Sequence, residues 1–240
     1  MHHIQSFLST MLIVFICSTL IAQSGDGNNP PEDGVIMDKT LQFASLTFSL
    51  HDRKSDNEQG LTNFYVVNKS ISWGVSLDYG FIFKPNVGVG LGVSYDKSDM
   101  ENTTRGITGI PTDNVVSSNE YTIRPFIKNF IPIDKGNRFF IINQTELSYT
   151  YDKTEKSSTY LGKTTDSESI KNAYGIGIRP GLLIFLYKNF GFEANINVLG
   201  IKSSTTKTTT TDEPDSKISS TDIDFKLAIL NLTFSFSLYF

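Results

Sequence analysis

The sequence predicts an all-β fold of eight antiparallel strands that occupies most of the chain. Three observations predict it. Bulky apolar residues recur at every second position in most segments, with small or polar residues between them, as on the two faces of a strand. Short turn sequences, recurring about every fifty residues, alternate with long polar stretches. The last stretch, Ala228 to Phe240, keeps the alternation to its terminal aromatic residue.

The first 39 residues precede the strand pattern. The run from Phe7 to Ile21 is very apolar but too short to span a bilayer comfortably, and the sequence turns polar at Gln23. This pattern predicts a cleaved signal peptide over residues 1–22. Residues 23–39 are rich in Gly, Pro, Asn and Asp and are expected to form a flexible periplasmic leader, which leaves residues 40–240 for the β domain.

Composition narrows the range of functions. The chain has 25 acidic and 21 basic residues, and this mildly acidic balance offers nothing for binding nucleic acid. The single cysteine, Cys17, lies in the predicted signal peptide, so the mature protein has no thiol chemistry. We expect no cofactor and no metal site, because the sequence has neither a phosphate-binding glycine motif nor a calcium-loop spacing.

The first strand is expected over residues 40–51, where Leu46, Phe48 and Leu50 share one face. Phe43 has the opposite parity, which predicts a β-bulge near Ala44. The polar residues 52–60 then form a first loop.

The clearest hairpin joins residues 71–83 to residues 87–95 through the turn Lys84-Pro85-Asn86. One face of this hairpin is bulky and often aromatic, and the other consists of Gly and Ser with a few carboxylates. Small residues suit the cramped interior of a narrow barrel, and the bulky face suits lipid. The hairpin therefore predicts a transmembrane β-barrel rather than a soluble sandwich.

The pattern recurs in the later strands, at residues 119–131, 138–151, 174–184 and 190–198 and at the end of the chain. Short turns near Asp134 and Lys188 match the one at Pro85, and the polar stretches 97–118, 152–169 and 201–220 are expected to be long extracellular loops. Short turns then lie at the periplasmic rim, and the even strand count places both termini there. The Thr-rich sequence near Thr208 leaves open that strands continue beyond the membrane.

Charged residues fall on the polar parity of these strands: Asp78, Asp96, Arg124, Lys128, Glu146, Arg179, Glu193 and Lys226. A narrow lumen must pair such groups, because an unpaired buried charge is expensive. We expect an ion-pair network that fills the lumen, in which Asp78, Glu146 or Glu193 are partners of Arg124 and Arg179. The alternative is a thin pore lined by charge.

The end of the chain places apolar residues at every second position, namely Leu232, Phe234, Phe236, Leu238 and Phe240. This stretch resembles the C-terminal signal by which the insertion machinery recognises bacterial outer-membrane barrels. Together with Trp73 to Tyr95 and the sequence RPGLLIFLYKNFGFE, it makes residues 41–240 resemble the small OmpA/OmpX-type barrels common in Bacteroidetes. The resemblance implies a Gram-negative outer-membrane location, contact with outer-membrane lipid and insertion through the C-terminal strand. We expect a monomer.

For function, the sequence favours a non-enzymatic protein with a structural or surface-interaction role, whose extracellular ligand it does not identify. A small passive pore is the alternative. A lipid-modifying outer-membrane enzyme is a distant third, because the mature chain has one histidine, His51, beside Ser49 and Asp52. His51 and Asp52 are adjacent in sequence and point to opposite faces of a strand, which is poor geometry for a catalytic relay.

Overall fold

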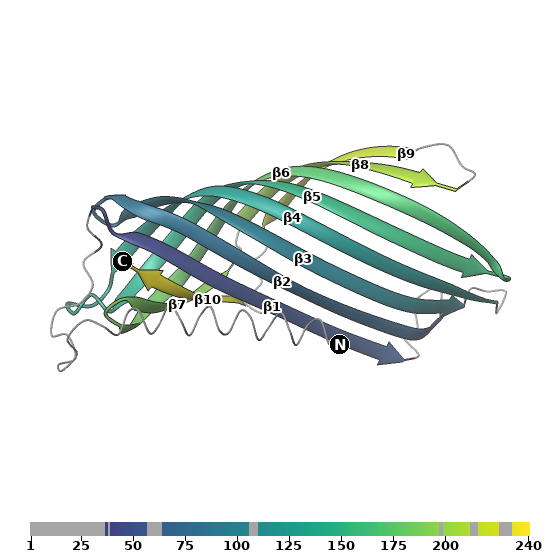
Figure 1. The fold of residues 1–240 in the computed structure, drawn as a ribbon, viewed down its shortest axis with the longest axis horizontal. Helices are drawn as coiled ribbons and strands as arrows, with labels where there is room; N and C mark the ends of the chain where they lie inside the picture. Colours follow the sequence, from purple (N-terminus) through teal and green to yellow (C-terminus); the bar gives the residue numbers. More distant parts are fainter. Residues whose placement is uncertain are drawn as a thin grey trace. The chain divides into compact units, whose positions relative to one another are not determined.

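The computed structural model describes residues 37, 39–56, 64–105, 110–196, 199–211, 216–225 and 232–240 (Figure 1). Apart from turns, these residues form β-strands, which confirms the predicted all-β class. No helix in this part of the chain is both long and apolar enough to cross a membrane. The predicted signal peptide and most of the predicted leader lie outside the described residues.

The described residues form ten strands, and every paired neighbour runs antiparallel. The first five are β1 (Gln42–Asp56), β2 (Phe64–Lys84), β3 (Val87–Arg105), β4 (Pro111–Pro132) and β5 (Phe139–Tyr160). The other five are β6 (Lys163–Tyr187), β7 (Phe190–Ile196), β8 (Leu199–Thr210), β9 (Ser216–Phe225) and β10 (Leu232–Tyr239).

Eight of these strands form a hydrogen-bonded ring, in the order β1–β2–β3–β4–β5–β6–β7–β10. The ring closes where β10 pairs with β1, from Phe43 opposite Tyr239 to Thr47 opposite Ser235. Gln42 and Phe240 exchange two further backbone hydrogen bonds of 2.8 and 2.9 Å. In Figure 1 the purple β1 and the yellow β10 lie side by side, although they come from opposite ends of the described chain.

The remaining two strands extend the sheet along β6, which changes partner along its length. Residues 181–187 of β6 pair with β7, whereas residues 167–178 pair with β8, and β9 pairs with β8. The eight strands of the ring match the eight predicted strands, with β7 as the seventh and β10 as the eighth. β8 and β9 are additional, and most of their residues belong to the stretch 201–220 that was predicted to be a loop.

Three short turns connect neighbouring strands at one end of the ring, near Pro85, Asp134 and Lys188 as predicted. Asn86 has a φ of 63°, a left-handed conformation that asparagine tolerates better than most residues. In the second turn the Asp134 carboxylate accepts a 2.8 Å hydrogen bond from the backbone N–H of Phe139. We call this end of the ring the turn end and the opposite end the hairpin end.

The predicted long loops at the hairpin end are wrong. Residues 97–105 and 111–118 belong to β3 and β4, residues 152–160 and 163–169 to β5 and β6, and most of residues 201–220 to β8 and β9. Their Ser and Thr side chains bond across strands, as Ser72 does with Ser98 and Ser169 with Thr208, each at 2.8 Å. Because both faces are polar in these extensions, the apolar alternation that marks the rest of the strands is missing.

Side chains alternate between the two faces of the ring as predicted. Large apolar side chains are exposed on the outward face: Phe48, Leu50, Leu77, Tyr79, Phe81, Leu91, Val93, Ile123, Ile127, Ile131, Ile141, Leu147, Ile176, Leu182, Phe234 and Phe236. The bulge predicted near Ala44 is wrong, because the register of β1 runs without interruption against both neighbours. Phe43 has the opposite parity because it points inward, where it is fully buried.

Inside the turn end, large rings pack into a cluster that we call the aromatic floor: Phe43, Phe126, Phe130, Phe140, Phe185 and Tyr239. Phe43 stacks on Tyr239 with ring centroids 5.7 Å apart. Met37, from the predicted leader, is buried in the same cluster, and its carbonyl accepts a 2.9 Å hydrogen bond from the Asn86 N–H. The floor therefore fills the interior of the ring beside the short turns.

Inward-facing glycines make room for the floor. A Cβ on Gly80 would lie 2.6 Å from the Phe43 ring, and one on Gly90 would collide with the ring of Phe126. Both glycines are direct register partners of each other across β2 and β3. The Gly-rich face expected to line a narrow interior thus lies against aromatic rings from β1 and β4.

Candidate functional site

The interior of the ring holds seven of the eight charged residues that the sequence analysis singled out. They come from β2, β3, β4, β5, β6 and β7 and lie on the inward parity of each strand. The eighth, Lys226, lies outside the described residues. Six of the seven form ion pairs, in two groups at different distances from the aromatic floor.

The group next to the floor is a single pair, Lys128 of β4 and Glu193 of β7. Lys128 Nζ lies 2.7 Å from Glu193 Oε2, and the two side chains are only 1% and 2% exposed. Two strands, β5 and β6, separate β4 from β7 in the ring, so the contact reaches across the lumen. Glu193 was predicted as a possible partner of the arginines, and it pairs instead with Lys128.

The floor itself completes the surroundings of this pair. The other oxygen of Glu193, Oε1, accepts hydrogen bonds from the hydroxyls of Ser237 at 2.7 Å and Tyr239 at 3.3 Å. Lys128 Nζ lies 5.3 Å from the centre of the Phe43 ring, a distance at which the ring's negative face attracts a cation. Both charges are therefore satisfied by protein groups.

The second group, which we call the arginine network, comprises Asp78, Arg124, Glu146 and Arg179. Arg124 Nη2 lies 3.1 Å from Asp78 Oδ1, and Arg179 Nη1 lies 3.3 Å from Glu146 Oε2. Arg124 Nε, at 3.9 Å from the same Glu146 oxygen, links the two pairs. All four side chains are 13–14% exposed, so the network is largely buried.

The strand between Asp78 and Arg124 explains how they meet. Gly92 of β3 is the register partner of both Asp78 on β2 and Arg124 on β4. A Cβ at Gly92 would collide with the Asp78 carboxylate. Glycine at this inward position leaves the space in which Arg124 passes over β3 to reach the carboxylate.

Farther toward the hairpin end the interior holds charges of both signs, with Lys171 of β6 opposite Asp152 of β5. Asp96 of β3 lies opposite Glu120 of β4, which in turn lies opposite Asp152 of β5. Asp152 accepts a 2.6 Å hydrogen bond from the Ser118 hydroxyl. Asp96 was among the charged residues predicted to face inward, whereas Glu120 and Asp152 were not, because both lie at or beyond the edge of the predicted strands. Within the described residues, no group of three or more His, Cys, Asp or Glu side chains is placed to hold a metal ion.

Of the other residues singled out from the sequence, those of the predicted insertion signal lie on the outward side of the ring, whereas Ser49 and His51 lie on the inward parity of β1 where the strand is exposed. Phe234, Phe236 and Phe240 of the predicted insertion signal are exposed on the outward side, Leu238 is half-buried there, and the side chain of Leu232 lies outside the described residues. His51 is exposed on β1, opposite Ser72 of β2. Ser49 lies opposite Gly74, and the Asp52 side chain is outside the described part.

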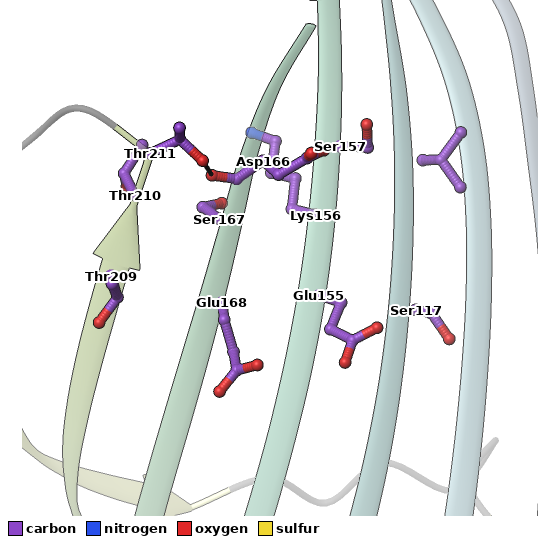
Figure 2. Close-up of a pocket in the computed structure, with 11 residues that line it drawn as sticks. Ser117, Glu155, Lys156, Ser157, Asp166, Ser167, Glu168, Thr209, Thr210 and Thr211 are labelled. Atoms are coloured by element: carbon purple, nitrogen blue, oxygen red, sulfur yellow. Dashed lines mark hydrogen bonds between the residues drawn. The ribbon is translucent and has the colours of Figure 1, made fainter.

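A hollow of about 560 Å³ lies on the extended strands at the hairpin end (Figure 2). Residues from β4, β5, β6 and β8, with Thr211 just beyond β8, line it, and Figure 2 shows carboxylates and hydroxyls on neighbouring strands. The Thr211 hydroxyl donates a 3.2 Å hydrogen bond to the Asp166 carbonyl at its edge. The hollow offers polar contacts. It lies closer to the hairpin end than the ion pairs inside the ring do.

No protein-family model matches the sequence, and no curated protein is significantly similar to it. Among solved structures, the chain is similar to a major outer membrane protein from Thermus thermophilus, with 13% sequence identity and a TM-score of 0.39. The match covers 83% of this chain and 99% of that one.

Proposed function

We propose that this protein is an integral outer-membrane β-barrel protein with a structural or surface-interaction role and a closed lumen. The observation that carries the proposal is the arrangement of its side chains, which is the inverse of that in a soluble protein. Large apolar residues are exposed on the outward face of the ring, and charged residues pair inside it. Soluble monomers rarely expose apolar patches larger than a few hundred Å², whereas a ring surrounded by lipid requires such a surface.

The height of the apolar surface supports a membrane location. On β3 the outward apolar positions run from Val87 to Tyr95, and on β4 from Ile131 back to Tyr121. These segments have about the 9–11 residues that a tilted strand needs to cross a bilayer. Tyr95 and Tyr121 pack together, with ring centroids 5.0 Å apart, where a membrane strand places its interfacial aromatic residues.

Closure of the strands supports the same conclusion. In the hydrocarbon core every backbone N–H and C=O needs a partner within the protein, so only helices and closed strand rings can span it. The pairing of β1 with β10 gives the ring no free edge at the turn end. The exposed Phe234, Phe236 and Phe240 on β10 and at its end would be the residues that the insertion machinery recognises.

The filled lumen favours a closed barrel over the passive pore. The aromatic floor occupies the turn end, the Lys128–Glu193 pair crosses the lumen above it, and the arginine network follows. An ion would have to separate these charges to pass. A lipid-modifying enzyme built on His51 is the weakest of the three readings, because His51 and Asp52 are adjacent on β1 and adjacent residues of a strand point to opposite faces, which is poor geometry for a catalytic relay.

Membrane fractionation tests the location. Full-length chain expressed in a Gram-negative host should be found in the outer-membrane fraction, resist extraction at high pH, and migrate faster on a gel unheated than boiled. A soluble protein whose migration does not depend on heating would contradict the proposal.

Conductance in a planar bilayer tests the closed lumen. The refolded protein should be electrically silent, because the floor and ion pairs block the lumen. Stable openings that change with Arg124→Ala would instead support the pore.

A further inference from the structure

Just beyond the outward tyrosines, a row of lysines crosses the outer face of the sheet. The register aligns Lys97 of β3, Asn119 of β4, Lys153 of β5, Ile170 of β6, Lys207 of β8 and Lys217 of β9 as successive cross-strand partners. We call the four lysines the lysine row. Residues paired across strands share a face, so these side chains lie on the same side as the apolar surface.

The next row toward the turn end is aromatic. Tyr95, Tyr121 and Tyr151 are cross-strand partners, and each lies two residues from the corresponding member of the next row. Two residues along a strand rise about 6.6 Å, or about 5 Å along the axis of a ring whose strands tilt as barrel strands do. If the tyrosines lie at the edge of the hydrocarbon core, the lysines lie at the height of lipid phosphates.

Two of these lysines, Lys97 and Lys153, form ion pairs with exposed carboxylates in the next row toward the hairpin end. Lys153 Nζ lies 2.9 Å from Glu155 and 3.1 Å from Glu168, and Lys97 lies 3.4 Å from Asp99. Hydrogen bonds to Glu155 and Glu168 hold the pKa of Lys153 above its usual range, so it remains a cation. Exposed pairs of this kind contribute little to stability, and an anionic ligand can take the place of one carboxylate without a large cost.

We propose that the lysine row binds the phosphate groups of anionic lipids in the outward-facing leaflet, with Lys97 and Lys153 as the principal contacts. This inference rests on the membrane location proposed above. The charge of the row complements a phosphate, and the adjoining tyrosines fix the depth at which it is presented. The hollow in Figure 2 begins at Glu155 and Glu168, directly beyond Lys153, and its acidic lining leaves room for an uncharged polar part of a headgroup.

Trp73 provides a local probe of this lipid. It is the only tryptophan in the sequence, it is the register partner of Lys97, and its ring lies 5.4 Å from that of Tyr95. The full mature chain would be refolded into vesicles that mix phosphatidylcholine and phosphatidylglycerol, with bromine atoms on the acyl chains of one lipid or the other. Quenching of Trp73 by each brominated lipid then reports which headgroup gathers beside Lys97.

Brominated phosphatidylglycerol should quench Trp73 more strongly than brominated phosphatidylcholine at the same mole fraction. Lys97→Gln should reduce that preference about two- to fivefold, in line with the attraction of one surface lysine for anionic lipid. Lys97→Arg should retain it, and Lys163→Gln, the same loss of charge at the exposed tip of the β5–β6 hairpin, should leave it unchanged. Inorganic phosphate at matched ionic strength should not displace the lipid.

Two results would overturn the inference, and they are distinguishable. Equal quenching by both lipids, or a preference that Lys97→Gln leaves intact, refutes selective binding of anionic phospholipid by the lysine row and keeps the membrane location. Absence of quenching by either lipid refutes the membrane location itself. If Lys97→Gln does not fold, sodium chloride added to the unmodified protein replaces it: a preference that is insensitive to salt refutes the inference.

Discussion

Removing the charge of Glu193 should destabilise the protein strongly, because it leaves Lys128 buried without a counter-ion. Glu193→Gln keeps the shape of the side chain and one carbonyl oxygen for the hydroxyls of Ser237 and Tyr239. It removes the negative charge 2.7 Å from Lys128 Nζ, where both side chains are at most 2% exposed. The change therefore isolates the charge from the packing.

The expected cost is about 3–5 kcal/mol, the range for breaking a buried ion pair by deleting one partner. The Phe43 ring, 5.3 Å from Lys128 Nζ, offsets part of it, since a cation over an aromatic face gains about 1–2 kcal/mol when desolvated. Replacing both members, as in Lys128→Met with Glu193→Gln, removes both buried charges. The double variant should be more stable than Glu193→Gln alone, and the difference measures the penalty of the unpaired lysine.

Urea unfolding of the protein refolded in vesicles, followed by Trp73 fluorescence, measures these costs. Asp99→Asn is the matched control, because it breaks the exposed Lys97–Asp99 pair and should change stability by less than about 1 kcal/mol. A Glu193→Gln variant that unfolds at the same urea concentration as the unmodified protein would refute the reasoning. It would mean that water reaches Lys128 and that the floor does not seal the turn end.

Three further predictions concern the interior and the C-terminal strand. Arg179→Ala should destabilise the protein by about 2–3 kcal/mol, because the only cation left near Glu146 among the described residues is Arg124 at 3.9 Å, beside a 3.2 Å hydrogen bond from Gln144; an unchanged unfolding midpoint would mean that Arg179 faces water. Gly90→Val should lower the yield of folded protein on heat-modifiability gels, since its Cβ meets the Phe126 ring and the Tyr79 carbonyl, whereas Gly200→Val, whose Cβ has 3.8 Å to its nearest neighbour, should fold; equal yields would contradict the packing argument. Phe240→Ser should hamper membrane insertion and leave the lumenal pairs intact, because Phe240 is 59% exposed; normal amounts of inserted protein would argue against a terminal recognition signal.

The parity of side chains could be predicted from the sequence, because alternation is a local property of a strand. Leu91 and Gly92 show this: adjacent residues of opposite type lie on opposite faces, one exposed and one beneath the Asp78 carboxylate. The same alternation placed Arg124 and Arg179 on the inward face with carboxylates within reach. Local pattern was sufficient wherever one face is apolar and the other is not.

Contacts across the lumen could not be predicted in this way. Lys128 and Glu193 lie on strands that are not neighbours, so their meeting depends on the tilt and stagger of the whole ring. Phe43 misled the prediction for a related reason: a large apolar residue was assumed to point outward, whereas the narrow turn end needs rings inside. The strand extensions were missed because polar residues on both faces carry no periodic signal.

The joining of β1 to β10 has a consequence for how the chain must fold. The hydroxyls of Ser45 and Ser237 bond across this seam at 2.7 Å, although the two residues are 192 positions apart in sequence. Hairpins such as β2–β3 can form early from local contacts, but the seam must wait until nearly the whole chain is in place. Until then the edges of β1 and β10 expose unpaired backbone groups, as any sheet edge does, and are open to pairing with the wrong strand. Folding of this protein should therefore end with a single slow closing step, and that step is when the chain is most vulnerable to proteases.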